Sequence, residues 1–163
     1  MCVSTTPDIL VGGPSATGML VHRLIAELAR RHGSLSPELT AREARKLLAR
    51  WEGGRAVVYR QAIRMRAITA AAVYFAEFSR PGWRLIDSLL VAGEAELDLV
   101  WQRAERIEVD ELKTGRFGAG ELARARVQAE GQAIAARQLF GESFAGVRVV
   151  PLTAPERAFW VGA

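Results

Sequence analysis

Apolar residues in the first half of the chain recur at the spacing of amphipathic helices. From residue 15 to 32 the large aliphatic residues return every three or four positions, which gathers them on one helical face. Glycine or proline follows each such segment, as expected where a helix ends. The pattern predicts an irregular start at residues 1–14, then three helices at residues 15–32, 37–51 and 55–79, with Ser15 as the N-cap of the first.

The pattern changes after Gly82, where β-branched and aromatic residues gather in short runs separated by turn residues. Helices and strands therefore partly segregate along the chain, in the order α-α-α-β-β-β-α-β-β. This order favours an α+β or mixed α/β fold, with a mixed β-sheet flanked by helices. The predicted strands are residues 83–92, 95–103, 106–113, 144–152 and 157–161, with a helix at residues 118–140.

Length, composition and net charge limit the classes of protein to which this chain can belong. The chain has 163 residues, half of them hydrophobic and a quarter charged, which fits one folded domain over residues 1–163. We expect residues 1–80 to be mostly helical and residues 83–163 to supply the sheet and its flanking helix. The formal net charge of +4 is a mild indication of a polyanionic partner.

The number of cysteines and the length of the apolar runs exclude several classes of protein. Cys2 is the only cysteine, so the chain has no intrachain disulfide and no four-cysteine zinc or iron–sulfur site. No apolar run is long enough to span a bilayer, and no basic segment introduces a signal peptide. We therefore expect no membrane partner and, by default, a cytoplasmic location.

The first candidate functional residues lie in the predicted strand at residues 106–113. Glu111 and Lys113 are two residues apart, so on a strand their side chains project from the same face. A carboxylate beside an ammonium suits a site that binds a divalent metal and handles a phosphate. Lysine is scarce: only Lys46 and Lys113 occur among the 22 basic residues. At Lys113 the site could therefore need a compact point charge.

The turn before this strand brings in a second carboxylate. A two-residue loop at Ala104–Glu105 would pair residue 103 with residue 106, which places Asp98 opposite Glu111 on the same face. Two opposed carboxylates repel each other unless a cation lies between them. The ordinary alternative, that these are solvated strand residues, stays open at this point.

His22 lies on the first predicted helix and shares a face with Ile25 and Ala29. On the sequence alone, a partly buried core histidine is the better interpretation.

Taken in order, these residues resemble a known family. The series Gly18-x-x-x-His22, Gly93-x-x-x-x-Asp98 and Glu111-x-Lys113-Thr114-Gly115 is similar to the PD-(D/E)XK nuclease superfamily. The branch it most resembles contains the RecB-type nuclease domains and the Cas4 proteins of CRISPR systems. The resemblance covers nearly the whole chain and implies a restriction-endonuclease-like core.

The resemblance also implies roles for single residues. Asp98 and Glu111 would be catalytic carboxylates that bind Mg²⁺ or Mn²⁺, with His22 and the backbone carbonyl of Leu112 as further ligands. Lys113 would hold the attacking water and stabilise the charged transition state. Arg116, which follows the lysine loop, and Gln128, on the next helix, would contact nucleic acid.

The chain departs from the family pattern in three places. Gln128 is followed four residues later by Gln132, where the family often has tyrosine. Asp87 lies about where many relatives carry an acidic residue, and a solvent-facing strand residue is an equal alternative there. The four cysteines that hold an iron–sulfur cluster in many relatives are missing, so a cluster-free nuclease is implied.

The sequence therefore predicts an enzyme, a metal-dependent nuclease that hydrolyses phosphodiester bonds in DNA, with single strands or ends as expected substrates. Roles in DNA repair or antiviral defence are implied by the family alone. The alternative is a non-catalytic subunit that binds DNA or a larger protein partner, such as a helicase or a CRISPR-type complex.

Overall fold

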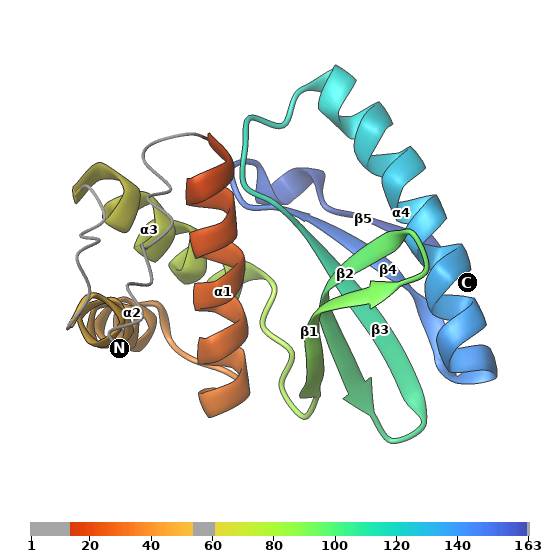
Figure 1. Ribbon diagram of the computed structural model, residues 1–163, viewed down its shortest axis with the longest axis horizontal. Helices are drawn as coiled ribbons and strands as arrows, with labels where there is room; N and C mark the ends of the chain where they lie inside the picture. Colours follow the sequence, from red (N-terminus) through yellow and green to blue (C-terminus); the bar gives the residue numbers. More distant parts are fainter. Residues whose placement is uncertain (1–13, 54–60, 163) are drawn as a thin grey trace, which may run out of the picture.

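The fold is α+β, built from helices and one mixed sheet (Figure 1). The computed structural model describes residues 14–53 and 61–162. Within these ranges the helices and strands follow the predicted order along the chain. The helices are α1 (Pro14–His32), α2 (Pro37–Glu52), α3 (Gln61–Glu77) and α4 (Ala119–Phe140), with short 3-10 turns at Gly141–Ser143 and Pro155–Arg157. The strands are β1 (Arg84–Ala92), β2 (Ala95–Arg103), β3 (Arg106–Lys113), β4 (Phe144–Pro151) and β5 (Phe159–Gly162).

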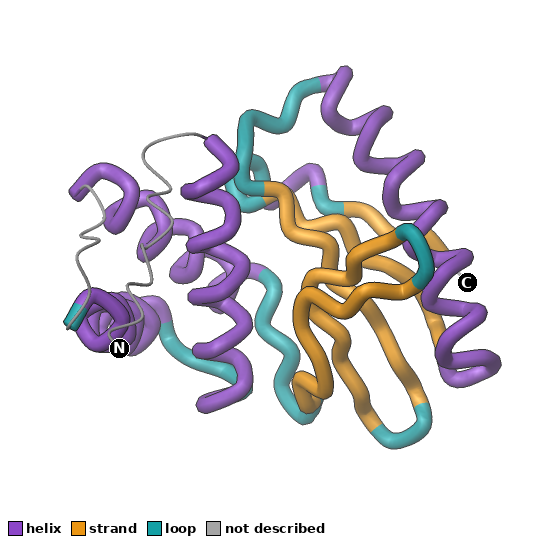
Figure 2. Tube along the Cα trace, in the orientation of Figure 1, coloured by secondary structure: helices purple, strands orange, loops and turns teal. Residues whose placement is uncertain are grey.

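The sheet has the strand order β1-β2-β3-β4-β5. Figure 2 shows its strands in orange, with helices on either side. Strands β1, β2 and β3 form an antiparallel meander, whereas β3 and β4 are parallel. Parallel neighbours need a crossover connection, which α4 supplies. Strand β5 returns antiparallel to β4. As a result β3 is the central strand, and its middle residues are buried on both faces.

Helices cover both faces of the sheet and create two cores (Figure 1). Helices α1, α2 and α3 pack together on one side, with Leu99, Trp101 and Leu112 facing them. Helix α4 covers the other side, where it meets Val109 and Val147. Because side chains alternate along a strand, Glu111 and Lys113 share the α4 side with Val109.

The predicted N-cap and several predicted boundaries were wrong, most of the boundaries by one or two residues. Helix α1 starts at Pro14, so Ser15 lies inside it; proline suits the first helical position, where its missing N–H costs nothing. The last strand starts at Phe159 rather than residue 157, because Pro155–Arg157 forms a 3-10 turn. Helix α3 ends at Glu77, two residues before the predicted end. Residues 1–13 and 55–60 of the predicted segments lie outside the described residues.

The turn between β2 and β3 confirms the predicted register. Arg103 pairs with Arg106 across the two-residue loop at Ala104–Glu105. The favoured two-residue loops have a positive φ at their first central residue, and Ala104 has a φ of 52°.

A buried charge cluster fastens the helical side to the sheet. Its members, which we call the Asp110 cluster, are Tyr74, Arg80, Glu108, Asp110 and Arg148. Asp110 accepts hydrogen bonds from Tyr74 Oη at 2.7 Å, from Arg80 Nη2 at 2.6 Å and from Arg148 Nη2 at 2.8 Å. Arg80 also pairs with Glu108. Asp110 is fully buried, so each of its oxygens depends on these donors.

Because of the Asp110 cluster, the free energy of unfolding should decrease as the pH falls into the acid range. Burial, the largest effect, raises the pKa of Asp110, but Arg148 and Arg80 outweigh it and hold that pKa below its ordinary value. Between the folded pKa and the unfolded value of about 3.9, the unfolded chain binds more protons than the folded one. The contribution of Asp110 is therefore complete above that unfolded value and is lost as the pH falls through the folded pKa.

Urea unfolding between pH 5 and pH 2 measures this effect. The difference in unfolding free energy between the wild type and Asp110→Asn should shrink toward the acid end. A difference that stays constant over this range would contradict the assignment.

No helix in the part of the chain that the structure describes combines the length and apolar character needed to cross a membrane.

Candidate functional site

Helix α1 brings His22 to the sheet through a close backbone approach. A Cβ atom on Gly18 would lie 3.2 Å from Oγ1 of Thr114, so glycine lets the helix lie close to the end of β3. His22 is four residues later and thus on the same helical face. Its Nδ1 lies 3.3 Å from Oδ1 of Asp98. The spacing Gly18-x-x-x-His22 therefore has a structural reason, and His22 faces a carboxylate rather than only the core.

Asp98 does not sit in the regular ladder that its predicted pairing requires. The ladder between β2 and β3 ends at the pair Leu99–Asp110, one pair before Asp98 and Glu111. Beyond that point the carboxylate of Asp98 accepts the backbone N–H of Leu112 at 2.7 Å. A side chain thus replaces a strand carbonyl as acceptor, and Asp98 is fixed at the place where the two strands separate.

Strand β1 is distorted opposite Asp98. The register pairs Ser88–Leu99 and Leu90–Leu97 flank Leu89, which places Leu89 across from Asp98. Leu89 has a φ of 54°, an unfavourable value for a leucine. Strained backbone of this kind is common beside functional residues, and here it accompanies the irregular course of β2.

Glu111 and Lys113 form the pair that their spacing predicts. Lys113 Nζ lies 2.5 Å from Oε1 of Glu111. The Glu111 side chain is almost completely buried, whereas that of Lys113 is 22% exposed, so the ammonium is at the edge of the site. The Leu112 carbonyl lies between them in sequence, and its role as a ligand stays a prediction.

Two glutamines of α4 complete the surroundings of Glu111. Gln128 donates from Nε2 to Oε1 of Glu111 at 2.8 Å and accepts from Lys113 Nζ at 2.5 Å. Gln132 donates from Nε2 to the other carboxylate oxygen of Glu111 and, at 2.7 Å, to the backbone carbonyl of Glu96. Gln128 was expected near the site, whereas the sequence marked Gln132 only as the place of a missing aromatic residue.

Burial and neighbouring charges shift the pKa values of Glu111 and His22. Burial raises the pKa of Glu111 to about 7, and the charge of Asp98 adds to this rise, while Lys113 and the hydrogen bond from Gln132 act against it. For His22, burial is the largest effect and lowers the pKa, but the hydrogen bond and charge of Asp98 outweigh it and leave the pKa raised. The charges of His22, Asp98 and Glu111 therefore influence one another.

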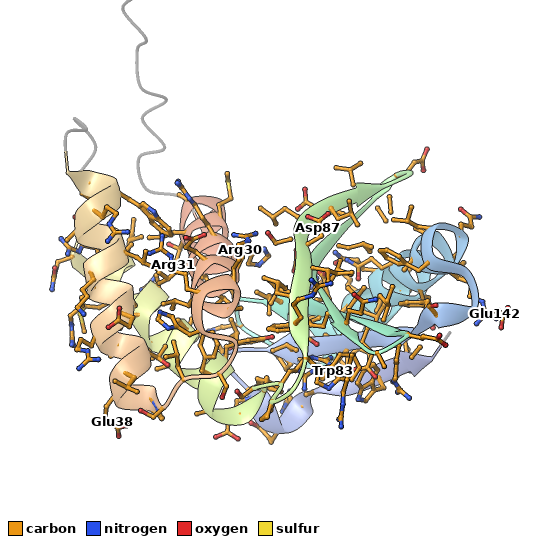
Figure 3. All side chains as sticks on the ribbon, turned by 90° about the horizontal axis from the view of Figure 1, so that it is seen from below. Arg30, Arg31, Glu38, Trp83, Asp87 and Glu142 are labelled. Atoms are coloured by element: carbon orange, nitrogen blue, oxygen red, sulfur yellow. The ribbon has the colours of Figure 1, made fainter. Side chains whose placement is uncertain are left out.

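The remaining candidates lie farther out. Arg116 is exposed in the connection between β3 and α4. This connection is held in place because Leu152 N–H donates to the Lys113 carbonyl at 2.9 Å and Thr153 Oγ1 to the Gly115 carbonyl at 2.7 Å. Asp87 is exposed on β1, and its carboxylate accepts the N–H of Ser88 at 2.7 Å (Figure 3). The solvent-facing interpretation of Asp87 agrees with this position.

Two carboxylates and one imidazole, from Asp98, Glu111 and His22, are ligand types that suit a divalent cation such as Mg²⁺ or Mn²⁺. The carboxylates of Asp98 and Glu111 are both buried, and the His22 imidazole lies 3.3 Å from Asp98. Over residues 14–53 and 61–162 the side chains do not place three or more histidine, cysteine, aspartate or glutamate groups where they could hold one metal ion together. A cation would therefore require the His22, Asp98 and Glu111 side chains to change rotamers.

Comparison with protein-family models, with curated proteins and with solved structures gives no match to this chain.

Proposed function

We propose that this protein is a metal-dependent deoxyribonuclease with a restriction-endonuclease-like core. One observation carries the proposal: four separate elements bring His22, Asp98, Glu111, Lys113 and Gln128 to one end of the sheet, linked by close polar contacts. A stable fold has no need of two buried acidic groups whose charges oppose each other, so this arrangement favours a catalytic role.

Each side chain has a task that follows from its position. Asp98 and Glu111 would supply carboxylate oxygens for Mg²⁺ or Mn²⁺, and His22 would supply a nitrogen. The bound ion would polarise a phosphate and make a water molecule more acidic. Lys113 holds its positive charge beside Glu111, where it can stabilise the charge that grows on phosphate oxygens. Gln128 fixes Lys113 and Glu111 relative to each other.

A nucleic acid is the class of substrate that this chemistry favours, and the family resemblance points to DNA. The exposed Arg116 lies three residues beyond Lys113, where it could contact a phosphate of the backbone. The net charge of +4 also favours a polyanion. A preference for single strands or ends, and a place in DNA repair or antiviral defence, follow from the family resemblance and are part of this proposal.

Thermal unfolding with Mn²⁺ tests the metal site. A ligand at 100 times its dissociation constant adds about 2.7 kcal/mol to the unfolding free energy. For a chain of this size, we expect a rise in Tm of roughly 5–10 °C. Asp98→Asn should remove most of this rise because it removes a charged ligand.

Asp87→Asn is the matched control, since it makes the same chemical change at an exposed position of the neighbouring strand and should keep the full rise. The metal site is refuted if Mn²⁺ leaves the Tm of the wild type unchanged, or if Asp98→Asn responds as strongly as the wild type.

One observation favours a second function, that of a non-catalytic subunit binding DNA or a larger protein. The carboxylates already have partners within the chain: Lys113 neutralises Glu111, and His22 and the Leu112 N–H satisfy Asp98. A chain with this function would bind DNA equally well with and without Mn²⁺ and would cleave neither single-stranded nor double-stranded DNA.

A further inference from the structure

Gln132 is a polar residue in a helix face otherwise made of alanine. The buried positions of α4 are Ala125, Ala129, Gln132, Ala133 and Ala136. Small side chains let the helix lie close to the sheet. Gln132 is only 2% exposed and reaches down from this face to β2 and β3.

The hydrogen bonds of Gln132 are incomplete in a way that packing does not explain. Its Nε2 serves two acceptors, the Glu111 carboxylate and the Glu96 carbonyl. Its Oε1 is buried and has no hydrogen-bond partner in the structure. An unpaired buried carbonyl is unfavourable, and an apolar side chain of the same size would avoid it. The two hydrogen bonds that Nε2 donates, to Glu96 and Glu111, therefore explain this glutamine better than a contribution to folding stability does.

The two acceptors belong to the strands that carry the two acidic groups. Glu96 is two residues before Asp98 on β2, and Glu111 is on β3. The regular ladder between these strands ends at Leu99–Asp110, so it no longer fixes their separation at this point. Gln132 joins the strands where the ladder has stopped.

The two oxygens of the Glu111 carboxylate have different partners. Oε1 of Glu111 faces Lys113 and Gln128, whereas Oε2 faces Gln132. A neutral donor on Oε2 restricts rotation of the carboxylate without neutralising its charge. Gln132 thus adds no second positive charge beside that of Lys113, which already pairs with Glu111.

We propose that Gln132 is a positioning residue, which sets the orientation of Glu111 and the separation of Glu111 from Asp98 for metal binding. This inference rests on the proposed function, since it assigns a task within the same site. Gln132 acts through Glu111 and need not touch the substrate.

The test is Mn²⁺ binding by Gln132→Met, followed as free Mn²⁺ by electron paramagnetic resonance in the absence of DNA. Methionine keeps the length of the side chain and removes the donor. We expect the dissociation constant for Mn²⁺ to rise about 10- to 100-fold, as is typical when a partner of a metal ligand is lost. DNA affinity measured in EDTA should stay within about twofold, and excess Mn²⁺ should restore cleavage, as expected for a positioning role.

Gln138→Met is the matched control, because Gln138 is exposed on the same helix. It should bind Mn²⁺ like the wild type. The inference is overturned if Gln132→Met also binds Mn²⁺ like the wild type. If the wild type itself binds no Mn²⁺, the proposed metal site falls and the inference falls with it.

A measurement on the unmodified protein covers the case in which Gln132→Met does not fold. On titration with Mg²⁺, the side-chain amide NMR signals of Gln132 should shift together with the backbone amide signal of Leu112, while those of Gln138 should not. A shift at Leu112 without any shift at Gln132 would refute the positioning role.

Discussion

Lys113→Met is expected to lower the rate of DNA cleavage by about two to four orders of magnitude, the usual range when a group that handles protons or charge is lost. The variant keeps an unbranched side chain of similar length but removes the positive charge 2.5 Å from Glu111. The fold should persist because Glu111 can take up a proton once its partner is gone. Single-turnover cleavage of labelled DNA with Mn²⁺ measures the effect.

The second lysine of the chain provides the control. Lys46 is exposed on α2 and pairs with Glu43 at 2.9 Å, three residues away. Lys46→Met makes the same change in charge and shape outside the site and should cleave at the wild-type rate. Equal rates for Lys113→Met and Lys46→Met would remove Lys113 from the mechanism.

Asp110→Asn is expected to destabilise the fold by about 3–5 kcal/mol, the range found when one partner of a buried ion pair is removed. The substitution preserves the volume of the side chain but leaves Arg80 and Arg148 facing a neutral amide. Both guanidinium groups are largely buried, so water cannot replace the lost carboxylate. Urea unfolding at pH 7 measures the loss, and the Tm should fall by roughly 10 °C.

Asp87→Asn again serves as the comparison, since that carboxylate is exposed and should change the unfolding free energy by less than about 0.5 kcal/mol. A loss below about 1 kcal/mol in Asp110→Asn would show that the Asp110 cluster is not needed to hold the helices on the sheet.

Local patterns were enough to predict much of the fold. The period of apolar residues located the helices and strands, because one face of each is buried. The two-residue loop at Ala104–Glu105 fixed the register of β2 and β3 and so brought Asp98 near Glu111. The spacing of Glu111 and Lys113 predicted a shared face, which the 2.5 Å contact confirms.

Contacts between distant segments could not be predicted in the same way. Arg80 and Arg148 are 30 and 38 residues from Asp110, and nothing local distinguishes them from the exposed arginines. Gln132 likewise meets Glu111 across 21 residues, and only the position of α4 over the sheet brings them together. A polar residue within an alanine face was the one sign in the sequence that could have marked it.

The separation of β2 and β3 also depends on tertiary structure. Ideal pairing would have placed Asp98 directly opposite Glu111, but the ladder stops one pair earlier. The Asp98 carboxylate then takes the Leu112 N–H, and its other oxygen turns to His22. Local rules describe a regular hairpin, whereas this arrangement requires α1 and the strained Leu89 of β1.

Cleavage of end-labelled DNA most directly tests the claim that these residues form a metal-dependent nuclease site. Linear single strands, duplexes and circles should be incubated with the wild type in Mn²⁺, in Mg²⁺ and in EDTA, beside Asp98→Ala. A metal-dependent nuclease site should give products with a divalent metal, none in EDTA, and none with Asp98→Ala. Cleavage that survives both EDTA and Asp98→Ala, or intact DNA under every condition with a folded protein, would contradict it.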